Sequence, residues 1–173
     1  MTKHPLARHI RSIPDFPKKG ILFRDITTLL KEPKAFQKAV DHLAAPFLKK
    51  KISCVAAVEA RGFILGGAVA HKLRCGFVPI RKPGKLPHKT HAETYDLEYG
   101  KDTLEIHKDA VRPGARVLVV DDLLATGGTA RAAVRLLKRC RAKVAGVIFL
   151  IELADLRGRD KLQGYPVYSL IKY

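Results

Sequence analysis

The chain has 173 residues, 47% of them hydrophobic, and its 33 Lys and Arg residues against 16 Asp and Glu residues give a formal net charge of +17. This length and composition predict one folded domain covering residues 1–173, with a sizeable core, and exclude a second domain. The N-terminal stretch lacks the apolar segment of a signal peptide, and no apolar run is long enough to span a bilayer. We therefore expect a cytoplasmic protein with no membrane partner.

The hydrophobic pattern alternates between helical and extended periodicity. In chain order it predicts a helix at 35–49, a strand at 53–58, a helix at 64–73, a strand at 77–81, two strands around 94–97 and 102–106, a strand at 117–120, a helix at 130–137 and a strand at 144–151. Such alternation is typical of an α/β fold with a mostly parallel central sheet and flanking helices. The N-terminal stretch and residues 155–173 do not continue it.

The three cysteines, Cys54, Cys75 and Cys140, are widely spaced and lie in apolar contexts. This arrangement indicates reduced packing residues rather than a disulfide framework or a metal site.

A strand-loop-helix junction carries the sequence VLVVDDLLATGGT between Val117 and Thr129. We expect the strand to end at Val120, so that Asp121 and Asp122 stand at its carboxyl end and accept hydrogen bonds from sugar hydroxyls. The next loop opens a helix whose first backbone N–H groups lack helical partners and can bind a phosphate. The residues expected to wrap the phosphate are Ala125, Thr126, Gly127, Gly128 and Thr129. A ribose 5-phosphate fits both halves of the junction.

Neither common nucleotide fingerprint fits this loop, which lacks the Lys of a Walker loop and the GxGxxG spacing. The alternative is that the aspartates merely end a strand and the glycines form an ordinary turn. The convergence of two acids, two glycines and two threonines on one junction favours the binding site.

A second strand ends in a charged loop, Glu59-Ala60-Arg61-Gly62, just before a predicted helix. Arg61 at a helix entrance can add bidentate hydrogen bonds to the backbone donors that bind pyrophosphate. The alternative is a structural ion pair between Arg61 and Glu59.

A basic loop with Arg81, Lys82 and Lys85 is interrupted by Pro83, Gly84 and Pro87, which predicts an irregular and mobile lid. Closing such a lid brings positive charge toward a leaving pyrophosphate and excludes water. The alternative is a solvated surface loop. If the next segment is extended, its two faces carry Glu93, Tyr95, Leu97 and Tyr99 on one side and Thr94, Asp96 and Glu98 on the other.

The motif VLVVDDLLATGGT resembles the phosphoribosyl pyrophosphate motif of type I phosphoribosyltransferases, in particular those that use adenine. Similar blocks occur in the same order over nearly the whole chain: FPKKGILFRDIT, VEARGF, IRKPGKLP, ETYDLEYGKDTLEIHKDAV and LIEL. The resemblance implies transfer of a 5-phosphoribosyl group to adenine, giving AMP and pyrophosphate in purine salvage. It also implies a flexible lid, a small hood built from about residues 1–30 and 155–173, and a homodimer.

The resemblance further implies roles for individual residues. Glu98 matches the acid that protonates, or holds the proton of, the imidazole side of adenine. Arg61, Arg81, Lys82 and Lys85 are implied to bind pyrophosphate. The adenine pocket is implied to consist of Leu22, Phe23, Arg24 and Leu153, although Leu22 and Leu153 alone suggest core residues and Arg24 an ion pair with Asp25. Mg²⁺ is expected as the cofactor, held by substrate and water with no direct protein ligand.

The net charge could attract nucleic acid, but the chain has no Trp and no basic-aromatic pattern of an RNA-binding motif, so we expect no nucleic-acid partner. Two alternatives remain: a phosphoribosyltransferase for another purine, and a noncatalytic regulator of the same fold that senses phosphoribosyl pyrophosphate.

Overall fold

The computed structural model describes residues 4–97 and 100–173. Its strands and α-helices are β1 (Arg11–Ile13), β2 (Phe23–Asp25), α1 (Thr27–Leu30), α2 (Pro33–Ala44), β3 (Cys54–Val58), α3 (Arg61–Leu73), β4 (Gly76–Ile80), β5 (Thr90–Leu97), β6 (Gly100–His107), β7 (Arg116–Leu124), α4 (Gly128–Arg139), β8 (Lys143–Glu152) and β9 (Val167–Lys172). Short 3₁₀ turns are η1 (Pro5–His9), η2 (Ala45–Phe47), η3 (Ala154–Leu156) and η4 (Gly158–Leu162).

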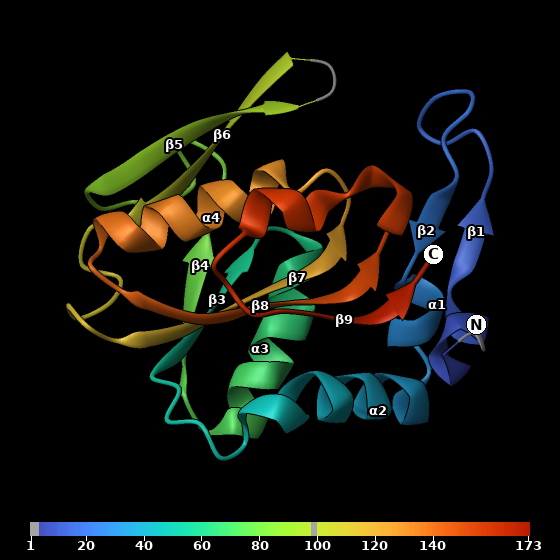
Figure 1. The fold of residues 1–173 in the computed structure, drawn as a ribbon, viewed down its shortest axis with the longest axis horizontal. Helices are drawn as coiled ribbons and strands as arrows, with labels where there is room; N and C mark the ends of the chain where they lie inside the picture. Colours follow the sequence, from blue (N-terminus) through green and yellow to red (C-terminus); the bar gives the residue numbers. More distant parts are fainter. Residues whose placement is uncertain (1–3, 98–99) are drawn as a thin grey trace.

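A five-stranded sheet in the order β4-β3-β7-β8-β9 forms the centre of the molecule, and every neighbouring pair in it is parallel. Helices α2 and α3 cover one face of this sheet, and α4 covers the other, with the β5–β6 hairpin lying beyond it (Figure 1). The predicted α/β fold with a parallel central sheet is therefore confirmed.

The order of the strands creates a crevice between β3 and β7. From β3 the chain passes outward to β4, and it later returns to β7 on the other side of β3 before continuing to β8 and β9. Ligands of open α/β sheets bind beyond the carboxyl ends of the strands at such a switch point.

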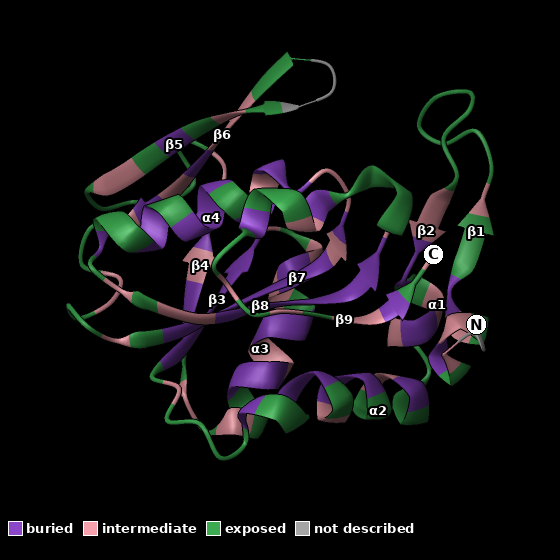
Figure 2. Cartoon of the chain, viewed as in Figure 1, coloured by how far each residue is buried: buried purple, intermediate pink, exposed green. Residues whose placement is uncertain are grey.

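Two apolar cores lie on the two faces of the sheet, as the purple strands in Figure 2 indicate. Along β3, Val55 and Ala57 pack toward α2 and α3, whereas Ala56 and Val58 pack toward α4. Residues 117–120 of β7 are fully buried and alternate between the two cores in the same way. Burial on both faces explains why these strands read as continuous apolar runs.

Helix α2 ends at Ala44, five residues earlier than the periodicity predicted. Pro46 follows in the sequence APF, and because proline has no backbone N–H the helical hydrogen bonds cannot continue at this residue, where the 3₁₀ turn η2 follows. The apolar pattern continues through Phe47, which is why the sequence alone suggested a longer helix.

The tail differs from the expectation. Residues 167–172 form β9, which pairs with β8 and completes the central sheet rather than belonging to a separate hood. As an edge strand β9 is only partly buried, so it lacks the continuous apolar pattern of the inner strands. Tyr173, the residue that follows β9, lies against Arg24 of β2. The N- and C-terminal segments therefore meet beside the crevice. Within the described ranges, no helix is long and apolar enough to cross a membrane.

Candidate active site

A cavity of about 1040 Å³ opens at the carboxyl ends of β3 and β7. Most of the residues that the sequence assigned to a site line it: Leu22, Arg24, Arg61, Lys82, Asp121, Asp122, Ala125, Thr126, Gly127, Gly128, Thr129 and Leu153. Its size and its mixture of apolar walls with a few converging polar groups suit a nucleotide-sized ligand.

The acidic pair lies at the floor of this cavity. On one side, pairing between β3 and β7 ends at Ala57 and Val120, so Asp121 does follow the last residue paired with β3. On the other side, β7 continues against β8 as far as Leu124. The prediction that the strand ends at Val120 was therefore wrong for this edge, because apolar Leu123 and Leu124 extend the strand beyond the acids.

Helix α3 packs very closely against this floor. A Cβ atom on Gly62 would lie 2.8 Å from Asp121 Oδ1 and 3.3 Å from the carbonyl oxygen of Val120. Only glycine allows this approach without a shift of β7. The first turn of α3 therefore brings Arg61 directly to the acidic pair.

Burial raises the pKa of Asp121 well above its usual range, and the charge of Asp122 raises it further. Burial also raises the pKa of Asp122, although the nearby Arg61 guanidinium opposes this effect. Asp122 Oδ2 lies 2.8 Å from Arg61 Nε, an ion pair whose geometry does not meet that of a directed hydrogen bond. Burial of these two adjacent carboxyl groups therefore makes their ionisation costly in the folded protein.

Asp121→Asn should stabilise the fold, and the stabilisation should increase as the pH rises above about 4. A carboxyl whose folded pKa is raised imposes no cost below its unfolded pKa, near 4, and an increasing cost as pH rises toward its folded pKa. The stability difference between variant and wild type should therefore grow from pH 5 to pH 8 in urea unfolding. The exposed Asp96→Asn serves as the control, and a difference as flat with pH as that of the control would contradict the buried-charge assignment.

The loop from Ala125 to Gly127 leads into α4, whose first residues, Gly128, Thr129 and Ala130, line the cavity. Gly127 adopts the left-handed conformation, with φ 79°, just before the helix. A Cβ atom there would lie 2.3 Å from the carbonyl oxygen of Gly158, and one on Gly158 would lie 2.2 Å from that of Ala125. The start of η4 thus supports this loop through backbone contact that only glycine permits.

Three basic residues in or beside the cavity, Arg61, Arg81 and Lys82, are paired with carboxylates. Arg61 contacts Asp122 and not Glu59, so the ion pair considered from the sequence does not form. Glu59 instead binds Arg81, with 2.8 Å from Arg81 Nη2 to Glu59 Oε2. It also accepts a 2.6 Å hydrogen bond from the backbone N–H of Lys82.

Burial alone would raise the pKa of Glu59, but the hydrogen bonds from Lys82 and Arg81 outweigh it and leave this pKa below its usual value. An ionised Glu59 therefore holds the start of the basic loop beside the crevice. Within this loop, the structure separates the three predicted pyrophosphate residues. Lys82 lines the cavity, whereas Arg81 and the exposed Lys85 are not among its lining residues.

Apolar and aromatic side chains form a further part of the cavity lining. Leu22, Leu153 and Leu156 line the cavity together with Tyr173, and the Arg24 guanidinium lies 3.7 Å from the centre of the Tyr173 ring. The ion pair between Arg24 and Asp25 suggested by the sequence does not form, because Asp25 pairs with Arg11 at 2.5 Å.

Of the residues predicted for the adenine pocket, Phe23 is not among those that line the cavity. Its ring packs edge-on against Phe16, with centroids 5.0 Å apart, and lies 5.2 Å from the Arg61 guanidinium. Glu98, the predicted catalytic acid, lies outside the described residues.

Sequence reasoning missed several residues of this cavity, among them Tyr95, Asp102, Asp155 and Tyr173. A signal existed for Tyr95, since the alternation of the extended segment placed it on the same face as Glu93. Glu93 is buried against Arg135 and Arg139 of α4, which confirms that this face of β5 is turned inward.

Comparison with known proteins adds the family. Residues 27–171 match the phosphoribosyl transferase domain. An adenine phosphoribosyltransferase of Rhizobium johnstonii is 59% identical over 97% of this chain and 94% of its own length. Among solved structures, the adenine phosphoribosyltransferase of Thermoanaerobacter pseudethanolicus has a TM-score of 0.94 and 54% identity over 97% of this chain and 98% of its own.

The adenine phosphoribosyltransferase of Saccharomyces cerevisiae, solved in complex with an imino-altritol bisphosphate and adenine, has a TM-score of 0.90 and 41% identity over 96% of both chains. The parallel sheet, the cavity at its switch point and these full-length similarities agree. The chain therefore belongs to the phosphoribosyltransferase family, and within it to the adenine phosphoribosyltransferases.

Proposed function

We propose that the protein uses this cavity to transfer the 5-phosphoribosyl group of phosphoribosyl pyrophosphate to adenine, releasing AMP and pyrophosphate. The observation that carries this proposal is the joining of two unlike surfaces in one cavity. An acidic floor beside a helix start suits a sugar phosphate, and the leucine-lined part suits a planar base.

In this reaction the bond from the anomeric carbon to the pyrophosphate oxygen breaks, and a bond to a ring nitrogen of adenine forms. Positive charge develops on the sugar, as in glycoside hydrolysis, and negative charge develops on the leaving group. Asp121 and Asp122 are positioned to bind the ribose hydroxyls and to stabilise the developing cation. The backbone of residues 125–129 would hold the 5-phosphate.

Glu98 would act as the catalytic residue toward adenine, either by protonating the imidazole ring or by holding its proton. Support for this role comes from the motif ETYDLEYG, in which Glu98 stands. Leu22 and Leu153 would enclose adenine, with Arg24 held at the edge of the pocket by Tyr173. Phe23 would contribute through Arg61 and Phe16 rather than by touching the base.

The pyrophosphate would be bound by Arg61 and Lys82, with Arg81 and Lys85 contributing positive charge from outside the cavity wall. Arg61 must then leave Asp122, so ligand binding exchanges one anionic partner for another. Because one ion pair replaces another, each new ion pair contributes little to the free energy of binding. A ligand with several phosphates, which forms several such pairs, is therefore favoured.

Mg²⁺ is proposed as the cofactor. Among the described residues, no group of three or more His, Cys, Asp or Glu side chains could hold a metal ion. We propose that Mg²⁺ is held mainly by oxygen atoms of the substrate and by water, with no direct protein ligand, an arrangement that this ion favours. Bound Mg²⁺ would neutralise charge on the departing pyrophosphate.

Homodimerisation and a cytoplasmic location also remain proposals. Exposed Ile64 and Phe77 on α3 and the edge strand β4 provide apolar surface suited to a subunit contact. The free thiols of Cys54, Cys75 and Cys140 suit a reducing compartment.

Calorimetric titration tests the site. Phosphoribosyl pyrophosphate with Mg²⁺ should bind the wild-type protein, and Asp122→Asn should weaken binding about 10-fold or more by removing a charged acceptor for the ribose hydroxyls. Omitting Mg²⁺ and adding EDTA should weaken binding in wild type. Equal affinity in both proteins would move the sugar site away from the acidic pair.

A further inference from the structure

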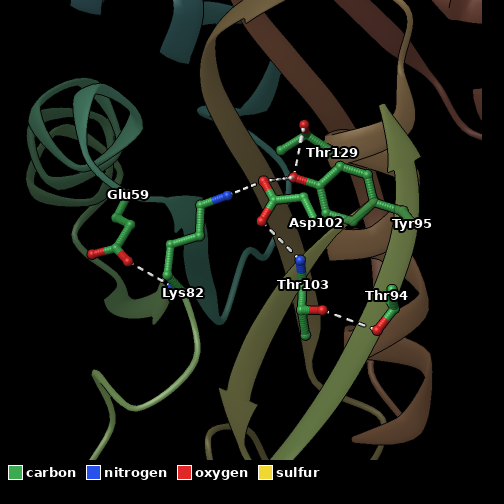
Figure 3. A network of polar contacts seen from close by, with 7 residues as sticks. All are labelled: Glu59, Lys82, Thr94, Tyr95, Asp102, Thr103 and Thr129. Atoms are coloured by element: carbon green, nitrogen blue, oxygen red, sulfur yellow. Dashed lines mark hydrogen bonds and ion pairs between the residues drawn. The ribbon is translucent and has the colours of Figure 1, made fainter. Parts of the chain in front are cut away.

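One cross-strand pair connects the β5–β6 hairpin to both binding loops. Tyr95 and Asp102 face each other in the register of the two strands, and the Tyr95 hydroxyl donates a 3.1 Å hydrogen bond to Asp102 Oδ2. Figure 3 shows this pair at the centre of a polar network that extends in two directions.

In one direction, Thr129 Oγ1 donates a 3.3 Å hydrogen bond to the Tyr95 hydroxyl. Thr129 belongs to the first turn of α4, and the hairpin packs closely there: a Cβ atom on Gly128 would lie 3.1 Å from the carbonyl oxygen of Asp96. In the other direction, the Lys82 ammonium contacts Asp102 Oδ2. The network thus joins the phosphate loop, the hairpin and the basic loop, and its members Lys82, Tyr95, Asp102 and Thr129 all line the cavity.

The protonation states in this network are well defined at neutral pH. Burial alone would raise the pKa of Asp102, but hydrogen bonds from Lys82, Thr103 and Tyr95 leave this pKa below its usual value. Burial raises the pKa of Tyr95 to about 12, against an opposing hydrogen bond from Thr129. Asp102 is therefore an anion that receives donors, and Tyr95 keeps the proton that it donates.

We propose that Asp102 is a positioning residue for the diphosphate of phosphoribosyl pyrophosphate: it holds the Lys82 ammonium at the cavity wall and, through Tyr95, fixes this lysine relative to the phosphate loop. This inference rests on the proposed function, because Lys82 is given a ligand there. It assigns a role to Asp102 and Tyr95, which the sequence left without one.

The physical reason lies in the flexibility of lysine. A lysine side chain has four rotatable bonds, and ordering it for a ligand costs conformational entropy. Here the Lys82 backbone N–H is held by Glu59 and its ammonium by Asp102, so both ends of the residue are ordered before the ligand arrives. Preorganisation of this kind raises affinity by reducing the cost of binding.

The hairpin also offers a matched control. Thr94 and Thr103 form the neighbouring cross-strand pair, and their hydroxyls lie 2.9 Å apart on the exposed face (Figure 3). Thr103→Val removes this hydrogen bond with little change in shape, yet leaves Tyr95, Asp102 and Lys82 in place. Any general effect of loosening the hairpin should appear in this variant.

The test is calorimetric titration of phosphoribosyl pyrophosphate with Mg²⁺ into four proteins: Asp102→Asn, Tyr95→Phe, Thr103→Val and wild type. Asparagine keeps an acceptor for Tyr95 but loses the charge that holds Lys82. We expect affinity to fall about 10-fold for Asp102→Asn and about 3-fold for Tyr95→Phe, with Thr103→Val within about 2-fold of wild type. The KM for adenine and the melting temperature should change little in all three.

A double-mutant cycle isolates the link to Lys82. Lys82→Met should weaken binding strongly in the wild-type background and add little to Asp102→Asn, because the two residues act as one unit. If the loss of affinity in the double mutant equalled the product of the losses in Lys82→Met and Asp102→Asn, the positioning role would be overturned. Unchanged or tighter binding by Asp102→Asn, which would make Asp102 a competitor for Lys82, would also overturn it.

Failure of the proposed function gives a different pattern. If wild type itself does not bind phosphoribosyl pyrophosphate, both the proposed function and this inference fail. If wild type binds it and Asp102→Asn matches Thr103→Val, the role of Asp102 alone is overturned.

Discussion

Glu98→Gln is expected to lower kcat by about 10²–10³ while leaving the KM for phosphoribosyl pyrophosphate within about 3-fold of wild type. Glutamine keeps the size and one acceptor of the side chain but can neither protonate the imidazole ring of adenine nor hold its proton as a carboxyl group does. The loss should therefore appear in the chemical step and not in the binding of the sugar phosphate. Initial-rate kinetics with both substrates varied measures this split.

A neighbouring carboxylate provides the control for Glu98. Asp96 is exposed on β5, two residues earlier in the chain, and Asp96→Asn removes the same charge from the same hairpin. It should retain nearly full activity. If Glu98→Gln were as active as Asp96→Asn, the base would be activated without this acid.

Gly127→Ala is expected to have the largest effect on the phosphate loop, destabilising the fold by about 2–4 kcal/mol and weakening phosphoribosyl pyrophosphate binding by more than about 10-fold. Its φ of 79° is unfavourable for alanine, and the added methyl group would lie 2.3 Å from the carbonyl oxygen of Gly158. Relief of that clash must move either the loop or the start of η4. Urea unfolding and calorimetric titration measure the two effects separately.

Gly67→Ala is the matched control, because Gly67 lies within α3 and a Cβ atom there would meet nothing within 4 Å. Alanine is the better helix former, so this variant should be neutral or more stable by up to about 1 kcal/mol, with unchanged binding. A Gly127→Ala protein as stable and as tight-binding as Gly67→Ala would show that the loop does not depend on its left-handed glycine.

The sequence predicted the inner part of the fold well, because the inner strands are buried on both faces. The runs at 53–58, 117–120 and 144–151 each lie within or around a strand of the parallel sheet. Strand β9 was not predicted, because it is an edge strand that is only partly buried and therefore lacks a continuous apolar pattern. Helix α2 is shorter than the hydrophobic pattern predicted, because Pro46 has no backbone N–H to continue the helical hydrogen bonds.

The binding loops were also predictable, because the charged residues and glycines that identify each loop are close together in the sequence. Pairings between distant segments were not. The sequence suggested pairing of Arg61 with Glu59 and of Arg24 with Asp25, but the fold pairs Arg61 with Asp122 and Asp25 with Arg11. Contacts across elements, such as Thr129 with Tyr95 or Gly127 with Gly158, depend on how hairpin and tail pack on α4.

The most direct test of the central claim is product formation by the intact chain. The purified protein would be incubated with Mg²⁺ and phosphoribosyl pyrophosphate plus adenine, hypoxanthine, guanine or xanthine in separate reactions, and nucleotide formation followed by chromatography. We expect AMP from adenine and little product from the other bases. A different nucleotide would contradict the assignment of the base pocket, and binding of phosphoribosyl pyrophosphate with no nucleotide from any base would contradict catalysis and indicate a regulator.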